Sequence, residues 1–129
     1  MFMEISKSIS STYIFTPALK YTDDRISDAL NYINDNISAN LTVKKVADHV
    51  HLSPKQLTRI FEKVMNTSPG TYIKDCRIKR IQNLLGNPDL SIKAIADMME
   101  YKDVSSLTRA YKKITDNTPH VSRKYMFEP

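Results

Sequence analysis

The chain carries one pattern of apolar and polar positions twice. The segment LTVKKVAD at 41–48 returns 49 residues later as LSIKAIAD at 90–97, with apolar residues at the same places. The polar positions that follow return 50 residues later: Thr58-Arg59, Lys63 and Pro69 become Thr108-Arg109, Lys113 and Pro119. Such self-similarity indicates a duplicated supersecondary unit. Each copy predicts a short helix, a tight turn and a second helix, which is a unit that fits a DNA major groove.

The apolar spacing predicts the helices of the first copy. Apolar residues recur at three- and four-residue intervals over 23–36, with aspartates in the first turn, where they suit the helix dipole. A second helix is predicted over 40–50 with Thr42 as its cap. Ser53-Pro54 starts a third, with Gln56 placed to complete a capping box. The core face of this third helix is predicted to hold Leu57, Ile60, Phe61 and Val64.

The remaining chain predicts four more helices. Ser68-Pro69 opens a long helix that runs to about Leu85, and Gly86 is its predicted stop. The later starts are Ser91 before 92–99, Asp103 before 104–114, and Thr118-Pro119 before a last helix toward Tyr125. The expected fold class is therefore all-α, with about seven helices in two helix-turn-helix subdomains joined by a long linking helix.

The expected domain organisation has four parts. They are an N-terminal segment at 1–21, a first helix-turn-helix subdomain at 22–67, the linking helix at 68–86 and a second subdomain at 87–129. The first segment is expected to be poorly ordered or to dock elsewhere, and it receives no function. A total of 129 residues with 41% hydrophobic residues is ordinary for a small globular protein, and only two glycines argue against an all-β chain.

The charge is uneven along the chain. Residues 1–54 carry five Lys/Arg against six Asp/Glu, whereas residues 55–129 carry fourteen against eight, and the net charge is +5. A basic surface attracts nucleic acid or an anionic membrane, so charge alone leaves both open, together with a merely soluble basic protein. The single cysteine, Cys76, requires no oxidising compartment, and no apolar run has the length of a signal peptide or a membrane helix. We therefore expect a cytoplasmic protein without a membrane partner.

The chain resembles the DNA-binding domain of the AraC/XylS family of bacterial transcription regulators over roughly residues 26–125. The matching positions are Ala47, Leu52-Ser53, Leu57, Arg59, Phe61, Ser68-Pro69, Tyr72, Ile95-Ala96, Tyr101, Ser105, Leu107, Arg109, Tyr111-Lys112, Pro119 and Arg123. The resemblance implies that two recognition helices enter adjacent major-groove segments of double-stranded DNA as a monomer. It also implies a nucleoid-associated regulator of the stand-alone type, an activator that touches RNA polymerase, with no cofactor.

The chain departs from the family pattern at four positions where relatives usually carry glycine. His51 and Glu100 occupy the turns between the paired helices, and Asn66 and Asp116 follow the recognition helices. A left-handed backbone there costs an ordinary residue about 1 kcal/mol. Asn and Asp tolerate that conformation better than most residues.

The resemblance assigns DNA-facing positions to both recognition helices. On the first these are Lys55, Gln56, Thr58 and Arg59, and on the second Val104, Ser105, Ser106, Thr108 and Arg109. Arginine pairs with guanine and glutamine with adenine, so these residue types suit base readout. For Arg59 the alternatives are a phosphate contact or a salt bridge within the protein. The short side chains of the second helix predict that it reads bases less sharply than the first.

Other cations are expected to contact phosphate or solvent. Lys63, Lys112 and Lys113 lie near helix ends, where phosphate contacts are expected. Arg123 is predicted to be either a phosphate ligand or part of a structural ion pair. A solvated face is expected for the linking-helix cations Lys74, Arg77, Lys79 and Arg80.

The sequence argues against an enzyme. His49 and His51 are two residues apart, which points them in different directions on a helix, and no metal-ligand motif or glycine-rich phosphate loop is present. We therefore expect neither a metal site nor a catalytic residue. The alternative function is a protein–protein interaction module or co-regulator that uses the same scaffold with weak DNA binding.

Overall fold

The computed structural model describes residues 24–127, and within that range it is all-helical, as the sequence predicts. The seven helices are α2 (Asp24–Asp35), α3 (Val43–His49), α4 (Pro54–Met65), α5 (Pro69–Leu85), α6 (Ile92–Met98), α7 (Val104–Thr115) and α8 (Pro119–Phe127). The expectation for the segment 1–21 lies outside the described residues. None of the seven helices is long and apolar enough to cross a membrane.

The helices begin where the sequence provides capping side chains. Side-chain oxygens of Thr42, Ser53, Ser68, Ser91 and Asp103 accept hydrogen bonds from the backbone N–H three residues later. At Ser53 the capping box is complete, because the Gln56 Oε1 atom also accepts from the Ser53 N–H at 3.0 Å. Each such cap contributes about 1 kcal/mol to the helix it starts. The starts predicted from these five caps are therefore confirmed, while the helix expected over 40–50 begins only at Val43.

All four positions at which glycine was expected have left-handed backbone conformations. The φ angles are 60° at His51, 60° at Asn66, 63° at Glu100 and 65° at Asp116. The long helix ends at Leu85 with Gly86 as its C-cap, as predicted, but Gly86 has a φ of −67° and not the left-handed conformation of a typical glycine cap. The long helix ends there because the next residues are Asn87 and Pro88: proline provides no N–H and disfavours helical angles in the residue before it.

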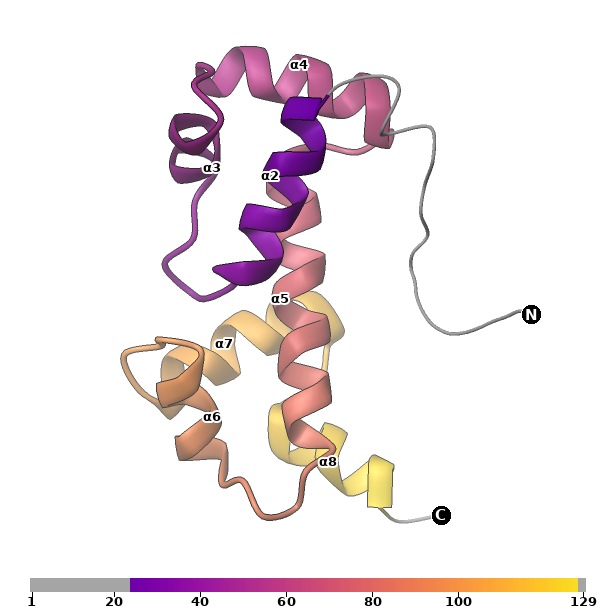
Figure 1. Cartoon of the computed structure of the whole chain (residues 1–129). Coiled ribbons are helices and arrows are strands. Elements are labelled where there is room, and N and C mark those ends of the chain that lie inside the picture. The colour runs from indigo at the N-terminus through magenta and orange to yellow at the C-terminus, as the bar shows by residue number, and fades with distance from the viewer. Residues whose placement is uncertain (1–23, 128–129) are drawn as a thin grey trace, which may run out of the picture.

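Two separate hydrophobic cores are joined by α5 (Figure 1). The buried residues of the first core are Ile26, Ala29, Ile33, Ile37, Leu41, Val46, Ala47, Val50, Leu57, Phe61 and Ile73. Those of the second are Ile78, Ile81, Leu85, Ile92, Ile95, Ala96, Met99, Leu107 and Tyr111. The N-terminal half of α5 thus closes the first unit, and its C-terminal half opens the second. The linking helix belongs to both folding units, which couples their stabilities.

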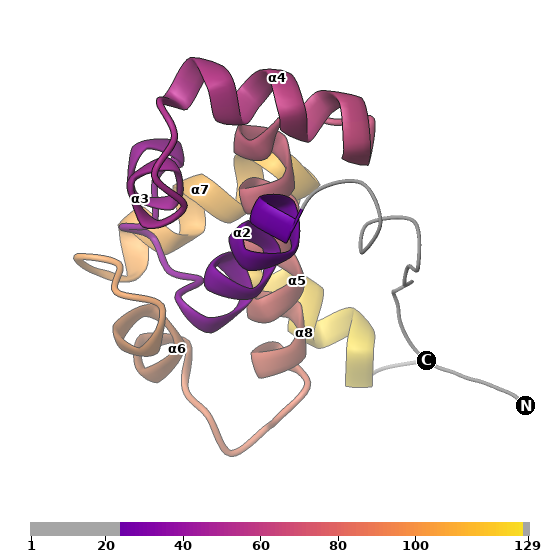
Figure 2. The same cartoon turned by 45° about the horizontal axis from the view of Figure 1, so that its top comes forward.

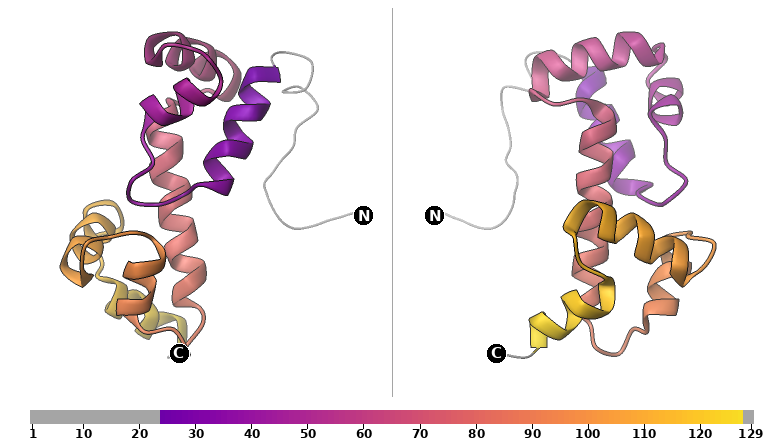
Figure 3. Two further views of the ribbon diagram at one scale, coloured as in Figure 1. Left: turned by 60° about the vertical axis from the view of Figure 1, so that its left-hand side comes forward. Right: turned by 180° about the vertical axis from the view of Figure 1, so that it is seen from behind.

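The two units lie at opposite ends of α5. Helices α3 and α4 are at one end and α6 and α7 at the other, with α2 beside the first half of α5 (Figures 1 and 3). Figure 2 shows α4 crossing over the ends of α2 and α5. The equivalent crossing in the second unit is made by α7, which packs against α6 and α8.

One arginine of α5 does not have the solvated role expected of it. Arg77 is half-buried, and its Nε and Nη2 atoms donate to the carbonyls of Ser38 (2.9 Å) and Leu41 (3.0 Å). Arg80 is exposed but also donates to the carbonyl of Asn34 at 3.2 Å. The last turn of α2 and the loop that follows it leave carbonyls without backbone partners beside α5, and these two guanidinium groups supply the missing donors. Lys74 and Lys79 remain exposed, as expected.

Candidate nucleic-acid interface

The first recognition helix, α4, has one buried face and one cationic face. Leu57 and Phe61 are fully buried and hold the helix on the first core. Lys55, Arg59 and Lys63 are exposed, and four-residue spacing places them along one side of the helix. The buried and exposed sets are separated as an amphipathic helix requires. The exposed side therefore presents three cations to a partner.

Arg59 has the freedom that a base-reading side chain needs. Among residues 24–127 no hydrogen bond or ion pair holds its guanidinium, which excludes the alternative of a salt bridge within the described part of the chain. Gln56 is less free, since its Oε1 atom already accepts the Ser53 N–H. Bidentate pairing of Gln56 with adenine would use the same oxygen, at the expense of the cap. Thr58 is half-buried between these positions.

The second recognition helix, α7, is built in the same way with different polar residues. Leu107 and Tyr111 bury its inner face, while Arg109, Lys112 and Lys113 are exposed. The Arg109 Nη2 atom donates to the Ser106 Oγ atom at 3.3 Å, so this arginine is partly held along its own helix. Its counterpart Arg59 has no such partner among the described residues.

The other candidate residues of α7 differ in access. Ser105 is exposed, whereas Ser106 and Thr108 are half-buried. Val104 is also half-buried and packs against the second core. Before it, Asp103 caps the helix: the backbone N–H of Ser106 donates to its Oδ1 atom at 2.7 Å and lowers the pKa of the carboxyl. Most of the short side chains on this helix thus have limited reach outward.

The two recognition helices present equivalent ends to the same side of the molecule. The N-terminal ends of α4 and α7 both lie on the side of α5 where α3 and α6 also lie (Figures 1 and 3). Both helices then run across α5, α4 at its N-terminal end and α7 nearer its middle, and both views agree on this arrangement. A partner that contacted both would therefore extend along α5.

Arg123 has a role that neither sequence alternative described. Instead of an ion pair, its Nε atom donates to the Leu85 carbonyl (3.1 Å) and its Nη2 atom to the Asn87 carbonyl (3.2 Å). These carbonyls lie where α5 ends, so they lack helical N–H partners. Arg123 thereby connects α8 to the end of α5, and these bonds leave the alternative of a phosphate contact untested.

Two contacts of the site could not be predicted from the sequence. Arg109 is oriented by Ser106, and a loop of the first unit bonds to the turn before α7 through Asn40 and Glu100. The only signal for the second was a charged residue, Glu100, at a turn where the family pattern has glycine. Within the described range no three histidine, cysteine, aspartate or glutamate side chains are placed to hold a metal ion.

Comparison with known proteins agrees with this geometry. A family model described as a helix-turn-helix domain matches residues 46–125. The arabinose operon regulatory protein of Escherichia coli (strain K12) is 30% identical over 98 residues, which are 75% of this chain and 34% of that protein. The chain thus spans about a third of the length of that relative.

Solved structures share the fold. An AraC-type DNA-binding domain protein from Chromobacterium violaceum superposes with a TM-score of 0.68 at 24% identity, covering 82% of this chain and 95% of that one. The DNA-binding domain of AdpA, solved with a target DNA, gives 0.69 at 16% identity, covering 80% and 93%. The duplicated units, the free face on each recognition helix and the match over 46–125 lead to one assignment. The chain belongs to the AraC/XylS family of helix-turn-helix, DNA-binding transcription regulators.

Proposed function

We propose that this chain binds double-stranded DNA as a monomer, with α4 and α7 in two successive major-groove segments of an asymmetric site. The observation that carries the proposal is that α4 and α7 both cross α5 with their N-terminal ends on the same side of it (Figures 1 and 3), and that each helix carries exposed cations. A dimeric helix-turn-helix protein reaches two groove segments through two-fold symmetry. Here the duplication supplies both helices within one polypeptide.

Arg59 is the principal base reader in this proposal. Its guanidinium is exposed and unpartnered within residues 24–127, so it has no internal bond to break before it donates to guanine O6 and N7. Lys55 and Thr58 flank it on the same helix. Gln56 contributes mainly by stabilising the N-terminus of α4 through the hydrogen bond that its Oε1 atom accepts from the Ser53 N–H.

The second helix is proposed to read more loosely. Arg109 is partly held by Ser106, and the half-buried Val104 and Thr108 offer methyl groups more than hydrogen bonds. Ser105 is exposed but short. We therefore expect each wrong base in this half-site to weaken binding less than a wrong base opposite α4.

Lysines supply affinity without sequence information. Lys55, Lys63, Lys112 and Lys113 are exposed on the two reading helices, where phosphate contacts fit. Four neutralised phosphates give a slope of about −3.6 for the logarithm of the binding constant against that of the salt concentration. The co-regulator alternative, which depends on apolar burial, predicts a slope near zero.

The test begins with duplexes selected from a random pool by the purified chain. Single-base substitutions across a selected site, measured for the native chain and for Arg59→Ala and Arg109→Ala, report which base each arginine reads. Each variant should lose about 1–3 kcal/mol of binding free energy and become indifferent to its own base. Retained preference at every position, or equal penalties in the two half-sites, would overturn this assignment of roles.

We also propose that the chain activates transcription by contact with RNA polymerase, in keeping with the resemblance to the family. Reconstituted transcription with purified polymerase and a promoter that carries a selected site provides the test. Added protein should raise transcript yield, and the Arg59→Ala variant should not. A decrease in yield with the native chain would assign a repressor instead. The family is one of regulators and not of enzymes, and we propose no catalytic residue.

A further inference from the structure

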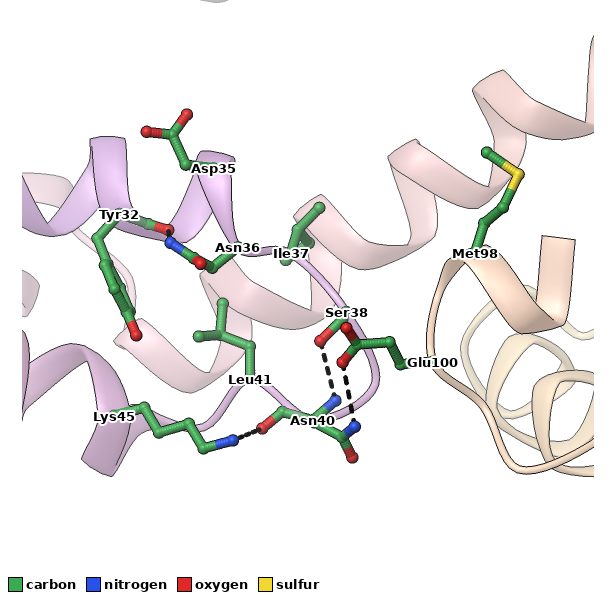
Figure 4. Close-up of a pocket in the computed structure, with 10 residues that line it drawn as sticks. All are labelled: Tyr32, Asp35, Asn36, Ile37, Ser38, Asn40, Leu41, Lys45, Met98 and Glu100. Carbon is green, nitrogen blue, oxygen red and sulfur yellow. Dashed lines mark hydrogen bonds between the residues drawn. The ribbon is translucent and has the colours of Figure 1, made fainter.

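A hydrogen-bonded joint connects the first unit directly to the second, apart from their connection through α5. The Ala39 N–H, in the loop between α2 and α3, donates to the Met99 carbonyl at 2.8 Å. Beside it the Asn40 Nδ2 atom donates to the Glu100 Oε1 atom at 3.1 Å (Figure 4). These residues are about 60 positions apart in the sequence, so the joint is a tertiary contact between the two helix-turn-helix units.

The loop on the first side of the joint is braced from three directions. Arg77 of α5 holds the Ser38 and Leu41 carbonyls at 2.9 and 3.0 Å. The Asn40 carbonyl accepts from the Lys45 Nζ atom at 3.0 Å. The backbone N–H of Asn40 donates to the Ser38 Oγ atom at 3.2 Å. Asn40 is therefore held at its backbone before its side chain reaches the second unit.

The residue on the other side has a backbone conformation that favours glycine. Glu100 has a φ of 63°, which is disfavoured for any residue with a Cβ atom. Glycine there would remove the strain but would also remove the carboxylate that accepts from Asn40. Strained residues persist where the surrounding structure holds them, and such outliers point to function. His51 occupies the same turn position in the first unit, with a φ of 60°.

The joint lies at the point that orients the second recognition helix. Glu100 lies in the turn between α6 and α7, and α7 begins at Val104. The loop 36–42 leads into α3, which packs against α4. A bond between this loop and that turn therefore limits the rotation of α7 relative to α4 about α5.

We propose that Asn40 and Glu100 are positioning residues that set the half-site spacing this chain accepts. The inference rests on the proposed DNA-binding function. Adding one base pair between half-sites turns one of them by about 35° and moves it along the duplex, given 10–10.5 base pairs per turn. A chain with the joint intact resists the matching rotation of α7. In a chain without the joint, α7 rotates more readily to match a half-site at an altered spacing.

The experiment uses duplexes selected from a random pool by the native chain of 129 residues. From one selected site, a spacing series is made with one base pair inserted or removed between the half-sites, and affinity is measured for each duplex. Glu100→Ala removes the acceptor but keeps a Cβ atom in the strained turn. Asn40→Ala removes the donor from the other side, so a folding failure in one variant leaves the other informative.

Two further variants separate positioning from general stability. His51→Ala places the same substitution at the equivalent left-handed turn of the first unit, away from the joint. Glu100→Gln keeps an acceptor oxygen at the same place. Thermal unfolding of all four variants shows whether any change in spacing preference merely follows stability.

The native chain should prefer the selected spacing over the two altered ones. Glu100→Ala and Asn40→Ala should each reduce that preference by about 3- to 10-fold, as loss of one exposed hydrogen bond to a charged group allows while the Ala39 to Met99 backbone bond persists. The double variant, with both Asn40→Ala and Glu100→Ala, should show a spacing preference no weaker than that of either single variant. His51→Ala and Glu100→Gln should retain the native preference.

An unchanged spacing preference in both alanine variants, or a uniform loss of affinity at every spacing, would overturn the proposal while leaving the DNA-binding function intact. A matching loss of preference in His51→Ala would also overturn it, because the effect would then be one of stability. If the native chain selected no duplex at all, that result would contradict the proposed DNA-binding function and, with it, the positioning role of Asn40 and Glu100.

Discussion

The contact between Tyr111 and Ser122 predicts an asymmetry in how the second unit loses stability. The Tyr111 hydroxyl donates to the Ser122 Oγ atom at 2.9 Å, which connects α7 to α8 by a side-chain hydrogen bond. Tyr111 is only 1% exposed, whereas Ser122 is half-buried and borders water. The two partners therefore differ in what happens when the other is removed.

Removal of the buried hydroxyl should cost less than removal of its partner. Tyr111→Phe deletes the polar group and leaves Ser122 able to bond to water, so we expect a loss of about 0.5–1.5 kcal/mol. Ser122→Ala leaves the buried Tyr111 hydroxyl without its partner and should cost about 1–3 kcal/mol. In the double variant nothing is left unsatisfied, and its loss should approach that of Tyr111→Phe alone.

Chemical and thermal unfolding of the four proteins measures these losses. For a chain of this size each kcal/mol corresponds to a change of about 4 °C in Tm. The order of stability should be native, then Tyr111→Phe together with the double variant, then Ser122→Ala. The reasoning is wrong if Tyr111→Phe is the least stable of the four, or if the losses of the two single variants simply add in the double one.

Three further outcomes follow from the structure. Arg123→Ala should lower Tm, since the carbonyls of Leu85 and Asn87 lose their donor, yet leave the salt dependence of DNA binding unchanged; a slope smaller by about 1 would instead assign Arg123 to phosphate. His51→Gly should stabilise the chain by up to about 0.5 kcal/mol in urea unfolding, because relief of the left-handed strain slightly exceeds the entropy cost of glycine, and a loss of stability would refute this. The lowered pKa of Asp103 means that its capping contribution is complete above pH 3.8 and is lost as the pH falls through the folded-state pKa. Asp103→Asn should therefore lose less stability on acidification than the native chain, and an identical acid profile would contradict that role.

Local signals allowed much of the fold to be predicted from the sequence. The starts of α4 and α5 follow from Ser53-Pro54 and Ser68-Pro69, because capping depends on residues three positions apart. The buried faces of α4 and α7 follow from helical spacing. At His51 and Glu100 the family pattern located the two turns but left their backbone conformation open, and the structure shows it to be left-handed.

The rest depends on contacts between distant segments. No local pattern indicates that Arg77 and Arg123 bond to backbone carbonyls 36 to 39 residues away. The solvated face expected for Arg77 was therefore wrong, and for Arg123 the described residues supply carbonyl partners in place of the ion pair that was one of two alternatives. The bond from Asn40 to Glu100 is of the same kind. Arginine has five donors and satisfies carbonyls as readily as it pairs with charges, which is why its partner cannot be inferred from residue type.

The most direct test of the account is hydroxyl-radical footprinting of a selected duplex with one chain bound, the stoichiometry being fixed by sedimentation. Insertion of α4 and α7 into successive groove segments predicts two protected patches on one face of the DNA, about 10 base pairs apart. Arg59→Ala should weaken one patch and Arg109→Ala the other. A single protected patch, or two patches that appear only when two chains are bound, would contradict the claim that one polypeptide reads both segments.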